Sequence, residues 1–433
     1  MTLDQTTAEP ATTAAEGDPS TDPQNAATEQ DVELSAGRRM VGYPPEPDTL
    51  VSLANWQDAP NQRWAFRHMR ELLPSQVIRA RSGSPRELPD AHRELGGLGL
   101  TRLDGTAGTV ADVMASTWTD ALVVLHDGAI VAEQYWEGML PSTRHLLMSV
   151  TKSVVGTVAA LLVTDGTLDP AALVTAYVPE VAGSGYAGAT LRDVLDMRTG
   201  VAFRETYTSP DAEVRVMERS MGWRPIKSGD PVGAYNYLAS LGTSGPHGEA
   251  FVYRSADTDM LGWVCERASG IRMAELISTL VWQPVGAEAD AEITCDAVGS
   301  AIHDGGMSTT ARDLARFGQM LLDDGEVEGR QVLPRAWLDE SRHPTADVRA
   351  AFAESDNEVY LPGGWYHNQF WFIPYGDGEI QLCLGIHGQM VYVNRSAGVV
   401  AVKQSSWPDA QNAAFLVDTI RAFNAVSAHL SAA

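Results

Sequence analysis

The chain has 433 residues, enough for one large domain with an insertion or for two domains. Hydrophobic residues make up 44% and charged residues 20%, values typical of a soluble globular protein, and no apolar stretch is long enough to span a bilayer. The formal net charge of −25 argues against nucleic acid or an anionic membrane surface as a partner; because the N-terminus also lacks a secretion signal, we expect a cytoplasmic protein.

Residues 1–37 differ from the rest in composition. They contain eight acidic side chains and no basic one, in a background of Ala, Thr, Pro and Gln that is nearly free of large apolar residues. Such a segment cannot bury enough apolar surface to fold, so we predict a disordered acidic tail. The folded domain is expected to span residues 38–433, beginning with loops and a short helix over 62–73.

The first clear strand signal is a hairpin. Two apolar runs, 121–125 and 129–135, flank the dipeptide Asp127-Gly128. An Asp-Gly pair between two apolar runs is a strong hairpin signal, because both residues accept the positive φ that a tight turn requires.

The hairpin leads into a Ser-x-x-Lys motif, Ser149 to Lys152. An uncharged run over 153–164 follows and ends at Asp165-Gly166, which predicts a buried helix capped by Gly166. Positions three apart share a helix face, so the Ser149 hydroxyl should lie beside the Lys152 amine at the helix N-terminus. The helix dipole there favours negative charge, and burial disfavours an ammonium. Both effects would activate the serine.

Lys152 is unusual for its residue type. Only three of the 31 basic residues are lysine, so this chain uses arginine almost everywhere else. Arginine cannot lose its proton, whereas a desolvated lysine can serve as a base. The alternative is structural: Ser149 caps the helix and Lys152 extends to solvent.

Helical patterns without alternating strands dominate the next region. The expected helices cover 170–178, 190–198, 211–221, 231–241 and 257–283. This pattern predicts a helical subdomain, at about 167–300, inserted into a sheet domain. A G-x-G-x-x-G match at Gly183, Gly185 and Gly188 follows no strand, because Pro179 interrupts the approach, and it does not indicate a dinucleotide site.

Tyr253-Arg254-Ser255 is a second motif that fits Ser149. A tyrosine near a serine and a lysine can act as a phenolate base, or can pass a proton to a leaving group. The alternative is a core tyrosine whose hydroxyl is simply hydrogen-bonded.

Strand patterns return near the C-terminus. A capped helix is expected over 308–323, with Ser308 or Thr309 as its cap. Expected strands cover 365–373, 380–387, 390–394 and 399–404, followed by a helix over 413–430. Strands at both ends of the chain with helices between them predict an α/β (α+β) fold, in which an antiparallel sheet is flanked by helices and carries the inserted subdomain.

A glycine-containing strand segment, residues 385–389, completes the candidate site. Acyl transfer needs two N–H donors where the oxyanion forms, and the amides of Ser149 and Ile386 are the candidates. His387 is a candidate substrate contact or an ordinary strand histidine. The ten histidines show no metal-type pair and the three cysteines are far apart, so we expect no metal, no cofactor and no disulfide.

In this order the three motifs resemble those of the serine β-lactamase and penicillin-binding superfamily, class C branch, near the family VIII esterases. Several stretches are more similar still to the 6-aminohexanoate-dimer (nylon-oligomer) hydrolases. These stretches are 148–153, 177–188, 195–200, 251–256 and 387–389. The similarity covers roughly residues 100–425 and is more specific for the superfamily than for a substrate.

The resemblance implies a β-lactamase/transpeptidase-like fold and assigns roles to residues. Ser149 would be acylated, with Lys152 as its proton acceptor or electrostatic partner and Tyr253 as the third member; the amides of Ser149 and Ile386 would form the oxyanion hole. The substrate contacts would be Tyr207 at the scissile amide and Trp371 as a cover, with Ser255 and His387 nearby.

Two departures from the superfamily are visible. The strand motif contains no Lys-Thr-Gly, so the cation that binds a β-lactam carboxylate is missing and efficient β-lactamase activity is not expected. Ser255 stands where many class C enzymes carry asparagine.

We therefore predict a serine hydrolase of short linear amides, of the 6-aminohexanoate-oligomer type, or of carboxylic esters, acting through an acyl-serine. Its partner would be a small-molecule substrate. The alternatives are a carboxylesterase only, or a non-catalytic penicillin-receptor-like ligand-binding domain. Whether the chain forms a homodimer stays open.

Overall fold

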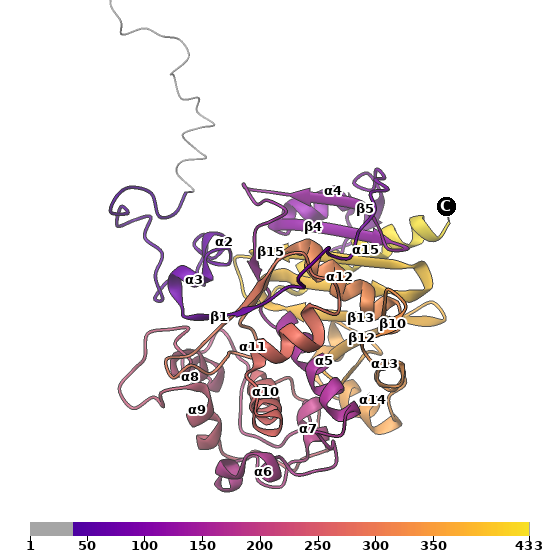
Figure 1. The fold of residues 1–433 in the computed structure, drawn as a ribbon. Helices are drawn as coiled ribbons and strands as arrows, with labels where there is room; N and C mark the ends of the chain where they lie inside the picture. Colours follow the sequence, from indigo (N-terminus) through magenta and orange to yellow (C-terminus); the bar gives the residue numbers. More distant parts are fainter. Residues whose placement is uncertain (1–37, 433) are drawn as a thin grey trace, which may run out of the picture. The chain divides into compact units, whose positions relative to one another are not determined.

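The structure, a computed structural model, describes residues 38–432 and divides the chain into two compact units, Met1–Leu50 and Val51–Ala433 (Figure 1). The predicted disordered tail, residues 1–37, lies outside the described residues. In the first unit, residues 38–50 form turns, in which the Thr49 hydroxyl donates to the carbonyls of Val41 and Glu46. The helices and strands of the described chain belong to the second unit.

A seven-stranded sheet forms the centre of the second unit, in the order β11-β12-β13-β14-β15-β4-β5, and all its neighbouring strands are antiparallel. Its strands are β4 (Thr119–His126), β5 (Ala129–Tyr135), β11 (Trp365–His367), β12 (Phe370–Tyr375), β13 (Gly378–Gly385), β14 (Gln389–Asn394) and β15 (Val399–Ser405). Early and late segments of the chain thus share one sheet, as predicted. Asp127 and Gly128 turn the β4–β5 hairpin with φ of 48° and 81°, the positive values that the Asp-Gly pair predicts.

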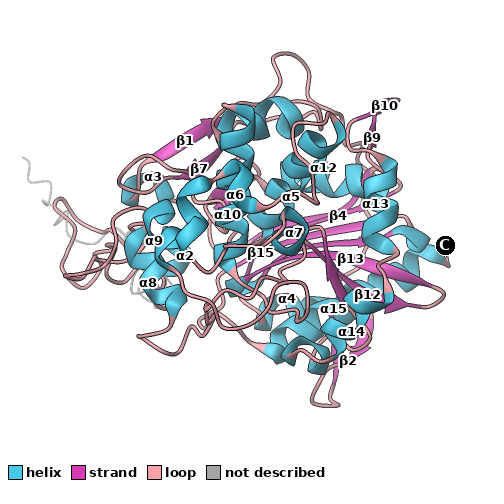
Figure 2. Cartoon of the chain, turned by 90° about the horizontal axis from the view of Figure 1, so that it is seen from below, coloured by secondary structure: helices cyan, strands magenta, loops and turns pink. Residues whose placement is uncertain are grey.

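Helices cover both faces of this sheet. On one face α4 (Val110–Ser116) packs against α15 (Ala413–Ser431), and on the other α12 (Ala311–Leu322) and α5 (Val150–Thr164) lie against the strands (Figure 2). Amphipathic helices such as α12 and α15 turn their apolar stripe toward the sheet. The buried residues of α15, the helix expected over 413–430, include Ile420, Phe423 and Val426, which lie three residues apart along the helix.

A second, four-stranded sheet has the order β1-β7-β8-β6 and was not predicted. Its strands are β1 (Ser75–Ile78), β6 (His145–Leu146), β7 (Ala291–Thr294) and β8 (Met307–Thr309). Strands of two to four residues are too short to show a period of two in the sequence. This sheet matters for the site, because β6 ends just before Ser149.

The segment between α5 and β7 is helical, as predicted. It contains α6 (Val174–Tyr177), α7 (Leu191–Leu195), α8 (Glu213–Ser220), α9 (Ala234–Ser240), α10 (Ser255–Ser269) and α11 (Met273–Leu276), and α6 to α10 gather in the lower half of Figure 1. The single helix expected over 257–283 is broken, because Gly270 adopts a φ of 72° and ends α10. Among residues 38–432, no helix is both long and apolar enough to cross a membrane.

Three other expectations need correction. The strand expected over 365–373 is the β11–β12 hairpin, and the helix expected over 62–73 is two short helices, α2 (Gln62–Ala65) and α3 (Met69–Leu72). The cap of α12 is Thr310, whose side chain accepts from the Asp313 amide, because Ser308 and Thr309 already belong to β8. Neither α13 (Arg335–Arg342) nor α14 (Ala346–Ala353) was predicted.

The tip of the β11–β12 hairpin joins the sheet to the helical segment. Asn368 and Gln369 turn it with φ of 53° and 67°. Gln369 accepts hydrogen bonds from Ser153 of α5 at 2.8 Å and from Thr258 of α10 at 2.7 Å, and it donates to the Leu195 carbonyl of α7 at 3.0 Å. One buried residue therefore connects three helices to the sheet, α5 through its backbone carbonyl and α7 and α10 through its side chain.

Candidate active site

Ser149 lies at a sharp turn between β6 and α5. Met148, the residue before it, has a φ of 47°, and Ser149 itself is already helical. Its side chain makes no capping hydrogen bond to the helix, and Lys152 is only 1% exposed. The structural alternative, a capping serine with a solvent-exposed lysine, is therefore wrong.

Three acceptors surround the Lys152 amine. Nζ lies 2.8 Å from Ser149 Oγ, 3.0 Å from Ser255 Oγ and 2.7 Å from the Asp304 carbonyl oxygen. The nearer carboxylate oxygen of Asp304 is 3.7 Å away. The Lys152 amine and the Ser149 hydroxyl are thus within the distance that a proton transfer between them needs.

The pKa of Lys152 is set by opposing effects. Burial alone would lower its pKa, as the sequence predicted, but the negative charges of Tyr253 as a phenolate, Asp304, Glu205 and Asp259 raise it, and the pKa lies above its ordinary value. At neutral pH the isolated site therefore carries an ammonium. The sequence indicated the effect of burial and left the resting protonation of Lys152 and Tyr253 open; the structure adds the carboxylates that other segments bring to the amine.

Tyr253 lies next to this pair. Burial and the charge of Glu205 raise the pKa of Tyr253, whereas the charge of Lys152 and the polar groups of Ser149 and Lys152 lower it. Burial is the largest of these effects, so the pKa remains above its ordinary value. The Lys152 amine is 5.3 Å from the centre of its ring. The structure thus brings together Ser149, Lys152 and Tyr253, the three residues predicted to share the chemistry.

The end of β13 passes close to Ser149. A Cβ at Gly385 would lie 2.6 Å from the Leu147 carbonyl oxygen and 3.1 Å from the Ser149 amide nitrogen, so only glycine fits there. This close approach places Ile386, the next residue, beside Ser149, and both line the same cavities. A pair of backbone donors from these residues remains the prediction for the oxyanion hole.

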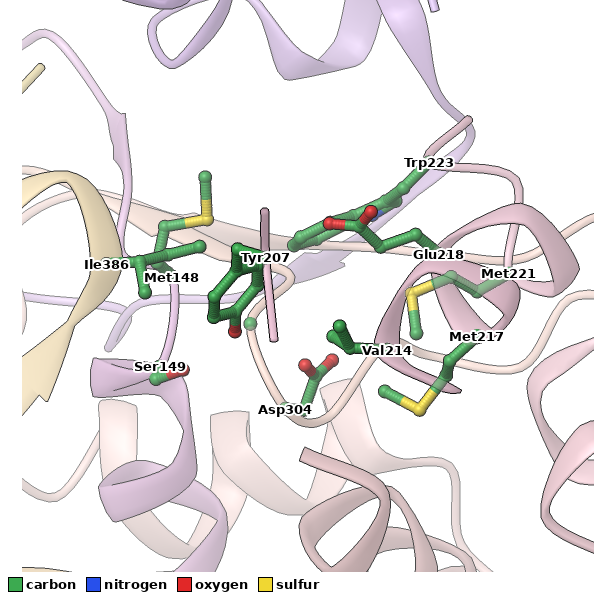
Figure 3. A pocket seen from close by; sticks show the side chains of 11 residues that line it. Met148, Ser149, Tyr207, Val214, Met217, Glu218, Met221, Trp223, Asp304 and Ile386 are labelled. Atoms are coloured by element: carbon green, nitrogen blue, oxygen red, sulfur yellow. The ribbon is translucent and has the colours of Figure 1, made fainter. Parts of the chain in front are cut away.

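Two cavities meet at Ser149. The larger has a volume of about 850 Å³, large enough for a small organic molecule, and is lined by Tyr253, Trp371, Glu205 and Tyr207, among others. The smaller holds about 10 Å³, room for one water molecule, and is lined on one side by Val214, Met217, Glu218 and Met221 of α8 and its end (Figure 3). Ser149, Tyr207 and Ile386 border both.

Tyr207 and Trp371, the two predicted substrate contacts, both line the large cavity. Tyr207 borders both cavities and donates its hydroxyl to Glu205 at 2.6 Å; burial and the Glu205 charge hold its pKa well above the ordinary value, so it stays a neutral donor. The Trp371 ring lies 5.1 Å from that of Tyr253 and forms part of the wall of the large cavity.

Ser255 and His387 lie differently. Ser255 is 1% exposed, borders neither cavity and bonds instead to Lys152 and Glu205. His387 is also buried away from both cavities: its Nδ1 pairs with the Trp407 carbonyl at 2.7 Å, its ring contacts Phe66, and burial lowers its pKa to about 4. Neither position provides a direct contact to a molecule in the cleft.

Three acidic residues of the site were missed. Glu205 and Asp304 surround the lysine, and burial together with Asp259 raises the Asp304 pKa to about 7, although Lys152 opposes this. Glu218 borders the small cavity and is held by Arg215 and Arg224, each at 2.6 Å. Glu205 was within reach, since it precedes Tyr207 by two residues; the other two carry no signal in the sequence.

Among residues 38–432, no group of three or more His, Cys, Asp or Glu side chains is arranged to hold a metal ion. Cys265, Cys295 and Cys383 are all buried free thiols, as predicted. Burial raises the pKa of the Cys383 thiol to about 12, so it is unreactive at neutral pH.

Comparison with known proteins places these features in context. The Beta-lactamase family pattern matches residues 107–422. A 6-aminohexanoate-dimer hydrolase from Paenarthrobacter ureafaciens is 38% identical over 402 residues, which cover 90% of this chain and 99% of the relative. A solved structure of a putative 6-aminohexanoate-dimer hydrolase from Bacillus anthracis matches with a TM-score of 0.81 at 27% identity, over 90% of this chain and 99% of that one. A family VIII carboxylesterase shares the fold, with a TM-score of 0.53 at 15% identity, over 73% of this chain and 96% of that one.

Proposed function

The chain belongs to the Beta-lactamase family, and on this premise we propose that it hydrolyses short linear amides or carboxylic esters through an acylated Ser149. The family, the fold class and the type of enzyme predicted from the sequence, a serine acyl-hydrolase, are confirmed by its relatives. The roles of individual residues and the identity of the substrate belong to the proposal, as does the expectation of a cytoplasmic protein that acts on a small molecule.

One observation carries the proposal. The Ser149 hydroxyl is 2.8 Å from the Lys152 amine, lies close enough to Tyr253 to lower the pKa of its hydroxyl and opens onto a cavity of about 850 Å³. A nucleophile, a proton acceptor and a proton donor at the wall of a substrate-sized cleft are the parts that acyl transfer requires.

In acylation, Ser149 Oγ attacks the substrate carbonyl carbon while its proton passes to the Lys152–Tyr253 pair. The carbonyl oxygen becomes an oxyanion, which the amides of Ser149 and Ile386 would stabilise. The tetrahedral intermediate then collapses: the bond to the leaving nitrogen or oxygen breaks, and Tyr253 gives that atom a proton. An amine or alcohol departs and an acyl-serine ester remains.

Deacylation reverses these roles. A water molecule loses a proton to the same pair as its oxygen attacks the acyl carbon, and the bond to Ser149 Oγ breaks. Ser149 regains a proton, and a carboxylic acid is released. Because the pKa values of both Lys152 and Tyr253 are raised, the resting pair holds both protons at neutral pH and kcat/KM should rise with pH.

The two cavities indicate how a substrate lies. Tyr253 borders only the large one, so the leaving group that it protonates belongs there. The relative from Paenarthrobacter ureafaciens is named for a linear amide, the dimer of 6-aminohexanoate, and an amide of that kind is our first candidate. The family VIII carboxylesterase shows that the same fold supports the ester alternative.

The test is a burst experiment with nitrophenyl acetate, together with labelling by a fluorophosphonate. We expect one acyl group per chain on Ser149, no burst and no label in Ser149→Ala, and steady turnover of the ester in the wild type. Wild-type rates in Ser149→Ala would end the proposal. The linear aminohexanoate dimer and nitrocefin, assayed in parallel, separate amidase, esterase and β-lactamase activities, and nitrocefin should be turned over poorly.

Lys152→Arg tests whether the lysine exchanges a proton. Arginine keeps the positive charge but cannot be deprotonated, so the loss in kcat/KM should approach that of Lys152→Ala, on the order of 1,000-fold or more. Near-wild-type activity in Lys152→Arg would leave Lys152 with a purely electrostatic role.

A further inference from the structure

Glu205 lies in the loop after α7 and collects three hydrogen bonds at the active site. Its Oε1 accepts from the Ser255 hydroxyl and the Tyr207 hydroxyl, each at 2.6 Å, and its Oε2 accepts from the Ser255 amide at 2.8 Å. All three partners can only donate to a carboxylate, so these directions are fixed.

The direction of the Ser255 bond determines that of the next one. A serine hydroxyl has one hydrogen, which here points to Glu205. Toward Lys152 Nζ, 3.0 Å away, Ser255 Oγ can therefore only accept. The Asp304 carbonyl oxygen, 2.7 Å from Nζ, likewise only accepts.

Two of the three hydrogens of the Lys152 ammonium are thus donated to Ser255 Oγ and to the Asp304 carbonyl oxygen. The third position on Nζ faces Ser149 Oγ at 2.8 Å. In the ammonium form this position donates a hydrogen to the serine. After deprotonation the lone pair necessarily occupies it, because the other two positions must keep their hydrogens, and the lone pair then faces the serine hydroxyl.

We propose that Glu205 is a positioning residue of this hydrolase: acting through Ser255, it directs the one exchangeable position of the Lys152 amine at the nucleophile. The proposal rests on the proposed function in taking Ser149 as the nucleophile. A neutral glutamine could not replace the carboxylate, since three donors converge on two oxygens and an amide offers only one.

The charge of Glu205 has a second, separable effect. The groups that face Lys152 are Tyr253, Asp304, Glu205 and Asp259, from four different segments, and the Glu205 charge helps to raise the pKa values of both Lys152 and Tyr253. Removing that charge should move the alkaline rise of kcat/KM to lower pH. Losing the orientation of Lys152 should lower the plateau of the same profile.

The experiment is the pH profile of kcat/KM for nitrophenyl acetate in wild type and Glu205→Gln. We expect a plateau about 10-fold to 100-fold lower in the variant, as for a catalytic group that is misdirected by a fraction of an ångström, and a rise that begins at lower pH. Glu213→Gln is the matched control, because Glu213 is another acidic residue bonded to this loop, through Arg204 at 2.6 Å, and it borders neither cavity. Its profile should match the wild type.

Ser255→Ala tests the hydrogen-bonded connection between Glu205 and Lys152 without removing the charge of Glu205. It leaves Glu205 in place but removes the hydroxyl between it and Lys152, so it should lower the plateau as far as Glu205→Gln does. The double variant should be at most about two-fold worse than either single one, since both changes break one chain of contacts. If Glu205→Gln does not fold, Ser255→Ala decides the matter: a wild-type plateau in that variant overturns the proposal.

A readout that needs no turnover uses the scarcity of lysine. Selective ¹³Cε labelling gives three lysine signals, from Lys152, Lys227 and Lys403. The Lys152 signal should titrate at lower pH in Glu205→Gln than in wild type and remain unshifted in Glu213→Gln. If the wild type cleaves no substrate but the Lys152 signal still shifts in Glu205→Gln, the proposed hydrolase function is wrong while the connection between Glu205 and Lys152 is supported. An unshifted titration together with an unchanged profile would refute the role of Glu205.

Discussion

Two fully buried lysines in this chain show opposite electrostatics. Lys152 is surrounded by Tyr253 and three carboxylates, which raise its pKa despite burial. Lys403 has the Thr117 carbonyl, the Ser405 hydroxyl and the Trp407 ring as neighbours, and burial lowers its pKa to about 7 because only Asp120 opposes it. At neutral pH Lys152 is therefore protonated, whereas about half of the molecules carry a protonated Lys403.

Lys403 makes stability depend on pH. Its folded pKa of about 7 lies below the unfolded value of about 10.4, so between these values the unfolded chain holds the extra proton. Its contribution to the free energy of unfolding therefore rises with pH, by up to about 1.4 kcal/mol per pH unit. Lys403→Met should be most favourable relative to wild type at or below pH 7 and lose that advantage toward pH 9. Urea unfolding at several pH values measures this, and parallel curves for the two proteins would contradict it.

Residues linked by sequence spacing were predictable, and residues linked only by the fold were not. Ser149 and Lys152 share a helix turn, and Tyr253 with Ser255 forms a recognisable motif. Glu205 and Asp304 reach the same amine from segments that no pattern connects to it. The charges of Asp304, Glu205 and Asp259, which add to that of an ionised Tyr253 in raising the Lys152 pKa, could therefore not be anticipated.

At the scale of elements, the β13 end is held against the nucleophile turn by a single glycine. Gly385→Ala would place a methyl group 2.6 Å from the Leu147 carbonyl oxygen, so the strand and the turn must separate. We expect a cost of about 1–3 kcal/mol in unfolding free energy and a fall in kcat/KM on the order of 100-fold.

The control for this strand is Gly378→Ala, at the other end of β13, where the nearest atom to an added Cβ is the Tyr375 carbonyl oxygen at 3.9 Å. Its activity should stay within about two-fold of wild type, as is usual for an open position. Equal kcat/KM in Gly385→Ala and Gly378→Ala would show that the close approach of β13 to Ser149 does not affect catalysis.

Helix α8 limits the space on one side of Ser149. Its Met217 and the adjoining Met221 form a wall of the small pocket, which has room for no more than a water molecule. The acyl half of a 6-aminohexanoate dimer must therefore share the large cavity, and Met217→Ala should leave the ratio of kcat/KM for nitrophenyl hexanoate to that for the acetate within about two-fold of wild type. A shift of that ratio toward hexanoate by about 10-fold or more in Met217→Ala, but not in Met320→Ala at a buried site in α12, would place the acyl chain against α8 instead.

Elements were predictable in proportion to their length. The β4–β5 hairpin, α5 and α15 all show enough periods of their pattern to be recognised. The four short strands of the second sheet and the hairpin inside 365–373 depend on pairing with distant segments. Their recognition needs the tertiary structure, because three residues of alternation are indistinguishable from a loop.

For the whole molecule, the net charge of −25 creates a negative field around a cleft that also contains Glu205, Glu354 and Asp356. Salt screens such a field, with a Debye length of about 10 Å at 0.1 M. The kcat/KM of an anionic nitrophenyl ester should rise several-fold between 0.01 and 0.5 M NaCl, and that of a cationic ester of similar size should fall. A neutral ester serves as the control. Identical salt dependence of all three would exclude steering by charge.

The contacts of Gln369 have a consequence for how the cleft admits a molecule. Helices α5, α7 and α10 are all tied to that hairpin tip, so separating the helical segment from the sheet would break several buried bonds at once. Access should instead come from the segment that carries Tyr207, whose main anchors are the side chains of Glu205 and Arg215. Hydrogen–deuterium exchange should then be fast at residues 205–210 and slow in α5, and the reverse order would point to a gate at the hairpin.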